Sequence, residues 1–153
     1  RSGQPIHAMI RGMEYRLVDN EHGRTRAREV RITVFVEEQG IPRELELDEL
    51  DATASHALAC DNDTPVATGR VNVDGQRATI ARIAVLPAYR GRGIAARIVG
   101  MLEQRARERS ATVAELSAHY YLKDFYTRLG YRRVPGEEWV AGYRLIKMQK
   151  KLT

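Results

Sequence analysis

The sequence predicts a single α/β domain, and three observations carry this prediction. Segments with the alternation of strands are interspersed with segments of helical periodicity, and no internal repeat or linker divides them. One strand-like segment leads through a glycine-bearing loop into a long amphipathic helix. The length, 153 residues, suits one hydrophobic core. We expect the domain to span residues 13–153 and residues 1–12 to form a tail, because the opening residues show no periodicity.

The first half of the chain predicts a strand, a helix and a hairpin. Residues 13–18 alternate loosely between polar and apolar, and Asn20 is a favoured helix-cap residue. Apolar residues then return at helical spacing over residues 24–38, until Gly40 ends the pattern. A short polar run, residues 61–64, joins two strand-like segments, which predicts an antiparallel hairpin of residues 56–60 and 65–73.

The second half begins with a strand over residues 78–86, which we expect to be largely buried on both faces because it is almost continuously apolar. A strong amphipathic helix follows over residues 93–109, and its apolar stripe should pack on the sheet. The remaining expected elements are a strand over residues 113–118, a short helix over residues 122–129, and closing strands over residues 131–134 and 143–148.

Composition narrows the class of protein. Hydrophobic residues make up 43% and charged residues 29%, and no apolar run of about 18 residues is present to span a bilayer. Cys60 is the only cysteine, so no intrachain disulfide can form, and nothing resembles a secretory signal, which favours a cytoplasmic protein. The net charge of +5 is spread along the chain without a nucleic-acid-binding motif. We therefore expect neither a nucleic-acid nor a membrane partner.

The loop between residues 86 and 94 carries the strongest chemical signal. Gly91 and Gly93 let the backbone approach a ligand closely, and the free N–H groups at the start of the following helix favour an anion. No Gly-Lys-Ser/Thr follows, and Ala96 stands where a dinucleotide fingerprint has its third glycine, so a Walker loop and a Rossmann site are disfavoured. The alternative is that the two glycines only allow the chain to turn and bind no ligand.

This segment resembles a known family. Arg90-Gly91-Arg92-Gly93-Ile94-Ala95 is similar to the Arg/Gln-x-x-Gly-x-Gly/Ala motif of the GNAT superfamily of N-acetyltransferases, and residues 122–131 resemble its late Phe-Tyr-x-x-x-Gly-Phe/Tyr segment. Residues 34–39 and 46–56 resemble the branch of glyphosate-type and related small-molecule N-acetyltransferases. The resemblance implies a mixed, mostly antiparallel sheet of six to seven strands, with splayed fourth and fifth strands and about four flanking helices.

The same resemblance implies acetyl-CoA as cosubstrate and assigns residues to it. Backbone N–H groups of the loop would bind the CoA diphosphate, and the fourth strand would pair with the pantetheine arm. The implied cofactor-binding residues are Ile83, Ala84, Val85, Arg90, Gly91, Arg92, Gly93, Ile94 and Ala95. Arg90 and Arg92 could equally be solvated loop arginines. No metal is implied, because the histidines and Cys60 lack ligand spacing.

Two residues are the candidates for catalysis. By resemblance Tyr126 lies near the thioester sulfur as the general acid that protonates the departing thiolate; the alternative is an aromatic core residue, as we expect for Phe125 and Tyr131. His119 titrates near neutral pH and is a candidate for the base that deprotonates the amine, with an ordinary polar contact as the alternative. Relatives in the suspected branch often carry a histidine in the last strand, but residues 142–148 contain none.

The remaining histidines and Cys60 are less suited to catalysis. His56 stands at a strand start and is expected to be structural, and His7 and His22 lie too near the N-terminus or a turn. Cys60 has no histidine near it in sequence and is expected to be a buried small residue.

The acceptor is ambiguous at this stage. Residues 37–51 hold seven carboxylates and one arginine, a pattern more typical of a solvated face, although in the family this region covers the acceptor pocket and would suit a cation. Arg70, Arg82 and Arg144 would instead favour a carboxylate or phosphate. We expect direct transfer to a primary amine of a small molecule in a ternary complex, and a homodimer is possible. The rival hypotheses are a non-catalytic acyl-CoA-sensing module of the same fold and a nucleic-acid-binding protein.

Overall fold

The computed structural model describes residues 12–153, so the expected tail lies outside the described residues except for Gly12. Seven strands form one sheet in the order β1-β2-β3-β4-β5-β7-β6. The strands are β1 (Met13–Val18), β2 (Ser55–Asp61), β3 (Thr64–Asp74), β4 (Arg77–Val85), β5 (Val113–His119), β6 (Arg132–Val140) and β7 (Tyr143–Lys151). Only β4 and β5 pair in parallel; every other neighbouring pair is antiparallel. The expected mixed, mostly antiparallel sheet is confirmed.

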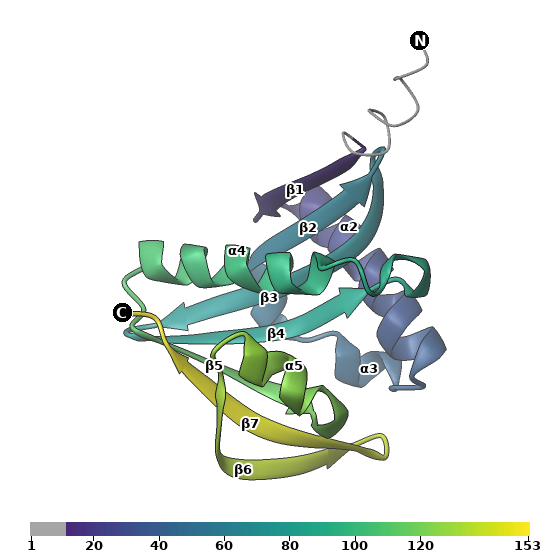
Figure 1. Cartoon of the computed structure of the whole chain (residues 1–153). Coiled ribbons are helices and arrows are strands. Elements are labelled where there is room, and N and C mark those ends of the chain that lie inside the picture. Colours follow the sequence, from purple (N-terminus) through teal and green to yellow (C-terminus); the bar gives the residue numbers. More distant parts are fainter. Residues whose placement is uncertain (1–11) are drawn as a thin grey trace.

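Helices cover both faces of the sheet. The α-helices are α2 (Glu21–Arg31), α3 (Arg43–Glu46), α4 (Ile94–Glu108) and α5 (Lys123–Arg128). The other helical segments are the π-helix η1 (Ile32–Glu38) and the 3-10 turns η2 (Glu49–Ala52), η3 (Pro87–Tyr89) and η4 (Tyr120–Leu122). Figure 1 shows α4 in front of β2, β3 and β4, and α2 behind them.

The alternation of β2 explains this arrangement. Ala57 and Ala59 belong to the main core with α4, whereas Leu58 and Cys60, which point to the other face, pack against Ala27 of α2. Both faces of β2 are therefore buried, in keeping with the apolar run Ala57 to Cys60 at its centre. Cys60 is a buried residue, as expected, and burial raises the pKa of its thiol.

The first helix differs from the expectation of one helix over residues 24–38. It begins earlier, at Glu21, because the Asn20 side chain accepts a hydrogen bond of 2.8 Å from the Gly23 N–H and caps it. From Ile32 the chain continues as the π-helical turn η1, and Gly40 (φ 74°) then ends the segment. The sequence pattern could not show this change, because an apolar stripe constrains the buried face and not the hydrogen-bond register.

Two other expectations need correction. β4 is not buried on both faces: Thr79 is exposed and residues 81–83 are only half-buried, because the strand's second half borders cavities. β6 is longer than the expected residues 131–134, since it continues past an irregularity in its pairing with β7 between Arg133 and Glu137. The other expected strands and helices are present within three residues of their expected ends.

The sheet opens between β4 and β5, and this opening positions the site. Their parallel pairing covers only Arg77 to Thr79 against Val113 to Glu115. Beyond it, β4 remains paired with β3, and β5 remains paired with β7 up to His119. The sheet is therefore split into two halves that diverge toward the carboxyl ends of β4 and β5.

Candidate active site

Two cavities meet where the sheet splits. The loop cavity, about 400 Å³, lies beside the loop that leads into α4, and the hairpin cavity, about 540 Å³, lies between α3, the split strands and the β6–β7 hairpin. Both are lined by Phe35, Ile83, His119, Leu122 and Tyr126. These shared residues form a junction at which a ligand in one cavity would face a ligand in the other.

The backbone of β4 is irregular at the junction. Arg82 has φ 59°, in the left-handed region that non-glycine residues avoid, and the pairing of β4 with β3 shifts between Thr68 and Arg70. The expected cofactor residues Ile83, Ala84 and Val85 follow this bulge, and all three line the loop cavity. Ile83 alone among them also lines the hairpin cavity. This segment has no partner on the β5 side among the recorded strand pairs of residues 12–153.

The loop cavity ends at the start of α4, where the first backbone N–H groups of the helix have no acceptor within residues 12–153. Gly91 and Gly93 have φ 78° and 80°, and a Cβ added at either would meet no heavy atom within 4 Å. Gly93 is the N-cap of α4 and offers no side chain to the first N–H groups of the helix. Gly91, Gly93, Ile94, Ala95 and Ala96 line this end of the cavity. Open space beside unpaired N–H groups and a positive helix end fits a diphosphate.

The two loop arginines are held by the protein itself. The Arg90 guanidinium donates two hydrogen bonds, of 2.6 and 2.7 Å, to the Glu38 carboxylate at the end of η1, and a third of 2.9 Å to the Val85 carbonyl. Arg92 donates to the Ala88 carbonyl at 3.1 Å and lies over the Tyr89 ring. Arg90 lines the loop cavity, and Arg92 is absent from the lining recorded for either cavity. Sequence reasoning missed Glu38, because 52 residues separate it from Arg90.

Tyr126 lies at the junction, on α5. Its side chain is 5% exposed and packs edge-on against Phe125 and Tyr131. Burial raises the pKa of its hydroxyl well above the ordinary value of 10, so the phenol carries its proton at neutral pH. Phe125 lines the loop cavity, whereas Tyr131 belongs to the core and donates a 2.8 Å hydrogen bond to Glu103.

His119 ends β5 and lines the junction as well. Its ring stacks on Tyr121 with centroids 5.1 Å apart and meets Tyr143 edge-on at 4.9 Å. Nδ1 is buried and has no hydrogen-bond partner within residues 12–153. Burial lowers the pKa of the imidazole below 6.5, so the ring is neutral at physiological pH and able to accept a proton. The structure thus brings both candidate catalytic residues to the same junction.

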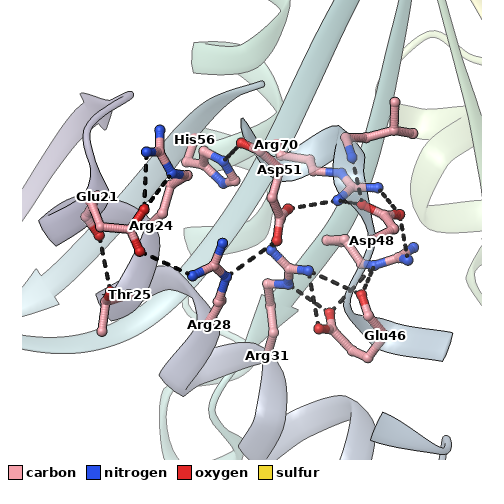
Figure 2. A network of polar contacts seen from close by, with 12 residues as sticks. Glu21, Arg24, Thr25, Arg28, Arg31, Glu46, Asp48, Asp51, His56 and Arg70 are labelled. Carbon is pink, nitrogen blue, oxygen red and sulfur yellow. Dashed lines mark hydrogen bonds and ion pairs between the residues drawn. The ribbon is translucent and has the colours of Figure 1, made fainter. Parts of the chain in front are cut away.

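A cluster of charged side chains holds the segment that walls the hairpin cavity (Figure 2). We call it the arginine–carboxylate cluster: Arg31, Arg70, Arg82, Glu46, Asp48 and Asp51. Arg31, only 1% exposed, donates to both Glu46 oxygens at 2.6 and 3.0 Å and to Asp51 at 2.8 Å. Arg70 donates to Asp51 at 2.6 Å and binds both oxygens of Asp48.

The cluster corrects the expectation of a solvated acidic face. Glu46 and Asp51 are buried, although Glu37, Glu44 and Glu49 are exposed as expected. Burial alone would raise the pKa of Asp51, but hydrogen bonds from Arg31 and Arg70 outweigh it and lower that pKa to about 2. His56 is buried beside the cluster, its Nε2 3.0 Å from the Asp51 carbonyl oxygen, which agrees with the expected structural role.

Residues at the mouth of the hairpin cavity were also missed by sequence reasoning. Glu138, Trp139, Val140 and Ala141 line it from the tip of the β6–β7 hairpin, where no strand was expected for the first three. The sequence offered only a tryptophan close to the turn residues Ala141 and Gly142, and its exposure is visible only in the structure. His22 lies on α2, away from both linings, and His7 is outside the described residues.

Within residues 12–153, no group of three or more His, Cys, Asp or Glu side chains is arranged to hold a metal ion. No helix in this part of the chain has the length and apolar character needed to cross a membrane.

Comparisons with known proteins agree with this geometry. The family model described as an acetyltransferase (GNAT) domain matches residues 24–152. A protein of Bacillus subtilis (strain 168), whose acetyltransferase name is itself an inference, is 34% identical over 142 residues, covering 91% of this chain and 97% of its own.

Solved structures share the fold. A crystal structure from Lactobacillus plantarum, of a protein named by inference as an N-acetyltransferase, matches with a TM-score of 0.85 and 28% identity, covering 93% of this chain and 99% of its own. A chain of the NatC complex bound to Gag peptide and CoA matches with a TM-score of 0.72 at 18% identity, covering 92% and 99%. The second likeness concerns the fold alone. The split sheet, the glycine loop before α4 and the family match over most of the chain together show that this protein belongs to the GNAT family of acetyltransferases.

Proposed function

We propose that the protein transfers an acetyl group from acetyl-CoA to a primary amine of a small molecule, by direct attack within a ternary complex. The observation that carries the proposal is the meeting of two cavities at Ile83, His119 and Tyr126. One cavity ends at free helix N–H groups suited to a diphosphate, and the other is open to a second substrate. A CoA-bound neighbour of the same fold supports the choice of cosubstrate.

In this proposal, one set of residues binds the cosubstrate and a second set transfers protons. Backbone N–H groups from Gly91 to Ala95 bind the diphosphate, and the unpaired edge of β4 beside Ile83 to Val85 binds the pantetheine arm. N–H groups of the same β4 segment stabilise negative charge on the reacting carbonyl oxygen. The Glu38–Arg90 ion pair holds the glycine loop against the end of η1.

His119 and Tyr126, which both line the junction, carry out the two proton transfers. His119, neutral because of its lowered pKa, accepts a proton from the ammonium group, whose ordinary pKa is about 10. Tyr126, protonated because of its raised pKa, donates to the departing thiolate. Burial that raises the pKa of the tyrosine also raises that of a thiol formed beside it, which keeps this transfer feasible.

The test compares ligands first and turnover second. Acetyl-CoA at about 100 times its Kd should raise the melting temperature by about 5–10 °C, with no matching shift from ATP or NAD. Thiol release should then require an amine. Absence of any acetyl-CoA shift in folded protein contradicts the proposal; binding without thiol release across an amine panel replaces it with a non-catalytic acyl-CoA-binding module.

A further inference from the structure

The walls of the hairpin cavity are mainly apolar. Phe35 and Leu116 lie among its lining residues, and Trp139 and Leu45, which are 65% and 56% exposed, line it from two different elements, β6 and α3. Large apolar side chains left exposed beside a cavity mark a surface that a ligand covers. A volume of about 540 Å³ accommodates a bicyclic aromatic group.

The charged side chains that line this cavity differ in whether a neighbouring side chain balances their charge. Its charged lining residues are Glu46, Arg82 and Glu138. Arg82 lies 3.3 Å from a Glu46 oxygen and 3.2 Å from an Asp48 oxygen, so its charge is matched within the arginine–carboxylate cluster. Glu138, in contrast, is exposed and forms no recorded ion pair with any residue between 12 and 153. The charge left for a ligand is therefore negative.

Arg70 and Arg144, the other two arginines that favoured an anionic acceptor, are also paired with carboxylates of the protein. Arg70 is buried and binds Asp48 and Asp51. Arg144 pairs with Glu137 and lies 4.1 Å from the centre of the Tyr120 ring. Neither belongs to the recorded lining of the hairpin cavity. An acceptor carboxylate or phosphate would thus enter beside Glu138 without a free cationic side chain to receive it, at a cost in binding.

We infer that the acceptor is an arylalkylamine without a carboxylate or phosphate, and that Trp139 and Glu138 determine this specificity. This inference rests on the proposed function. The reactive nitrogen lies at the junction beside His119, the aromatic ring lies between Trp139 and Leu45, and Glu138 favours cationic over anionic molecules at the mouth. Trp139 and Glu138 act on binding; neither is a catalytic residue.

The charge part of the inference is tested with three related amines. Tryptamine, L-tryptophan amide and L-tryptophan share one ring system, and the last two differ chiefly in the charge of one group. We expect kcat/KM for L-tryptophan amide to exceed that for L-tryptophan by about tenfold or more, and Glu138→Lys to reduce this ratio by about tenfold. Glu44→Lys is the matched control, because Glu44 is exposed on α3 beside the lining residue Leu45, forms no ion pair within residues 12–153 and does not itself line the cavity. It should leave the ratio within about twofold.

The ring part is tested with Trp139→Ala. The KM for tryptamine should rise about tenfold, as expected for a lost aromatic contact. An unchanged thermal shift with acetyl-CoA verifies that the variant is folded. Faster turnover of L-tryptophan than of its amide, or an unchanged tryptamine KM in Trp139→Ala, overturns the inference.

A binding measurement separates this inference from the proposed function. Calorimetry of tryptamine with the protein saturated in CoA should show binding that weakens about tenfold in Trp139→Ala. If no amine releases thiol but this binding is found, the proposed function fails and the inference about the cavity stands. If tryptamine does not bind while another amine is acetylated, the inference fails and the proposed function stands.

Discussion

Single side chains matter most at the junction, where burial shifts two pKa values in opposite senses. The same cause keeps the Tyr126 phenol protonated and the His119 imidazole neutral. A proton-bearing phenol and a neutral imidazole therefore coexist at neutral pH among the residues that line both cavities. Each can be removed with little change of shape.

Tyr126→Phe removes only the hydroxyl. We expect kcat to fall about 100-fold, because a positioned general acid contributes at least that much, while the KM for acetyl-CoA changes less than about twofold. Steady-state kinetics measure both quantities. A kcat within about threefold of that of the unmodified protein would show that the Tyr126 hydroxyl is not a general acid. The ring would then act only in packing.

His119→Gln should produce a deficit that depends on pH. At pH 7 we expect kcat/KM to fall about 100-fold, because the amine then lacks a base. The deficit should shrink toward pH 10, where the amine loses its proton unaided. In the unmodified protein the acid limb should lie below pH 6.5, since the lowered pKa of His119 keeps the imidazole neutral down to that range. A deficit of constant size from pH 6 to 10 would indicate a polar contact instead.

At the scale of elements, close packing of α4 on the sheet fixes the position of the glycine loop. A Cβ at Gly69 of β3 would lie 2.5 Å from Ile83 Cδ1, 2.9 Å from Ile98 and 3.0 Å from Leu102. Gly69 thus lets α4 and the junction strand β4 approach each other. The periodicity of residues 93–109 predicted which face of α4 is buried, but no sequence feature indicated which strand residue lies beneath it.

Gly69→Ala is expected to reduce the free energy of unfolding by about 1–3 kcal/mol, the usual cost of overpacking a core. Gly100→Ala is the control: Gly100 lies within α4, and an added Cβ meets nothing within 4 Å. This control should stabilise by about 0.5–1 kcal/mol, because alanine favours a helix interior. Urea titrations give both values, and equal effects of the two substitutions would contradict the packing argument.

For the whole molecule, the arginine–carboxylate cluster joins segments that are distant in sequence. Arg31 comes from α2, Arg70 from β3 and Arg82 from β4, and their carboxylate partners come from residues 46–51. Buried ion pairs are weak evidence of net stability, but removing one partner leaves an unpaired charge in the interior. The cluster therefore fixes the position of the segment that forms one wall of the hairpin cavity.

Asp51→Asn should lower the free energy of unfolding by about 3–5 kcal/mol. The pKa of Asp51 is lowered from 3.8 to about 2 in the folded protein, so its contribution is present above pH 4 and is lost as the pH falls toward 2. The unmodified protein should lose about 2 kcal/mol from this group over that window. Denaturation curves at several pH values measure the loss. Asp63→Asn, at an exposed ion pair with Arg26, should change stability by less than about 1 kcal/mol.

Local signals predicted most of the fold. The alternation of residues 13–18, the caps and the glycine loop depend on neighbours in sequence, and these elements were predicted correctly. The cluster could not be predicted, because Glu46 and Asp51 resemble solvated carboxylates until α2 and β3 bring arginines to them. Trp139 was missed for the same reason: its position beside a cavity depends on where the fold places the hairpin relative to α3. The roles of Tyr126 and His119 remain predictions.

The hairpin tip contributes to one cavity only. Residues 138–141 line the hairpin cavity, and within the described chain no residue beyond Tyr126 lines the loop cavity. Under the proposed function, substitutions at these four positions would alter acceptor binding and leave the residues proposed to bind CoA unchanged. We therefore propose that acceptor preference can diverge among proteins of this architecture through changes at the hairpin tip, while binding of the acetyl donor is retained.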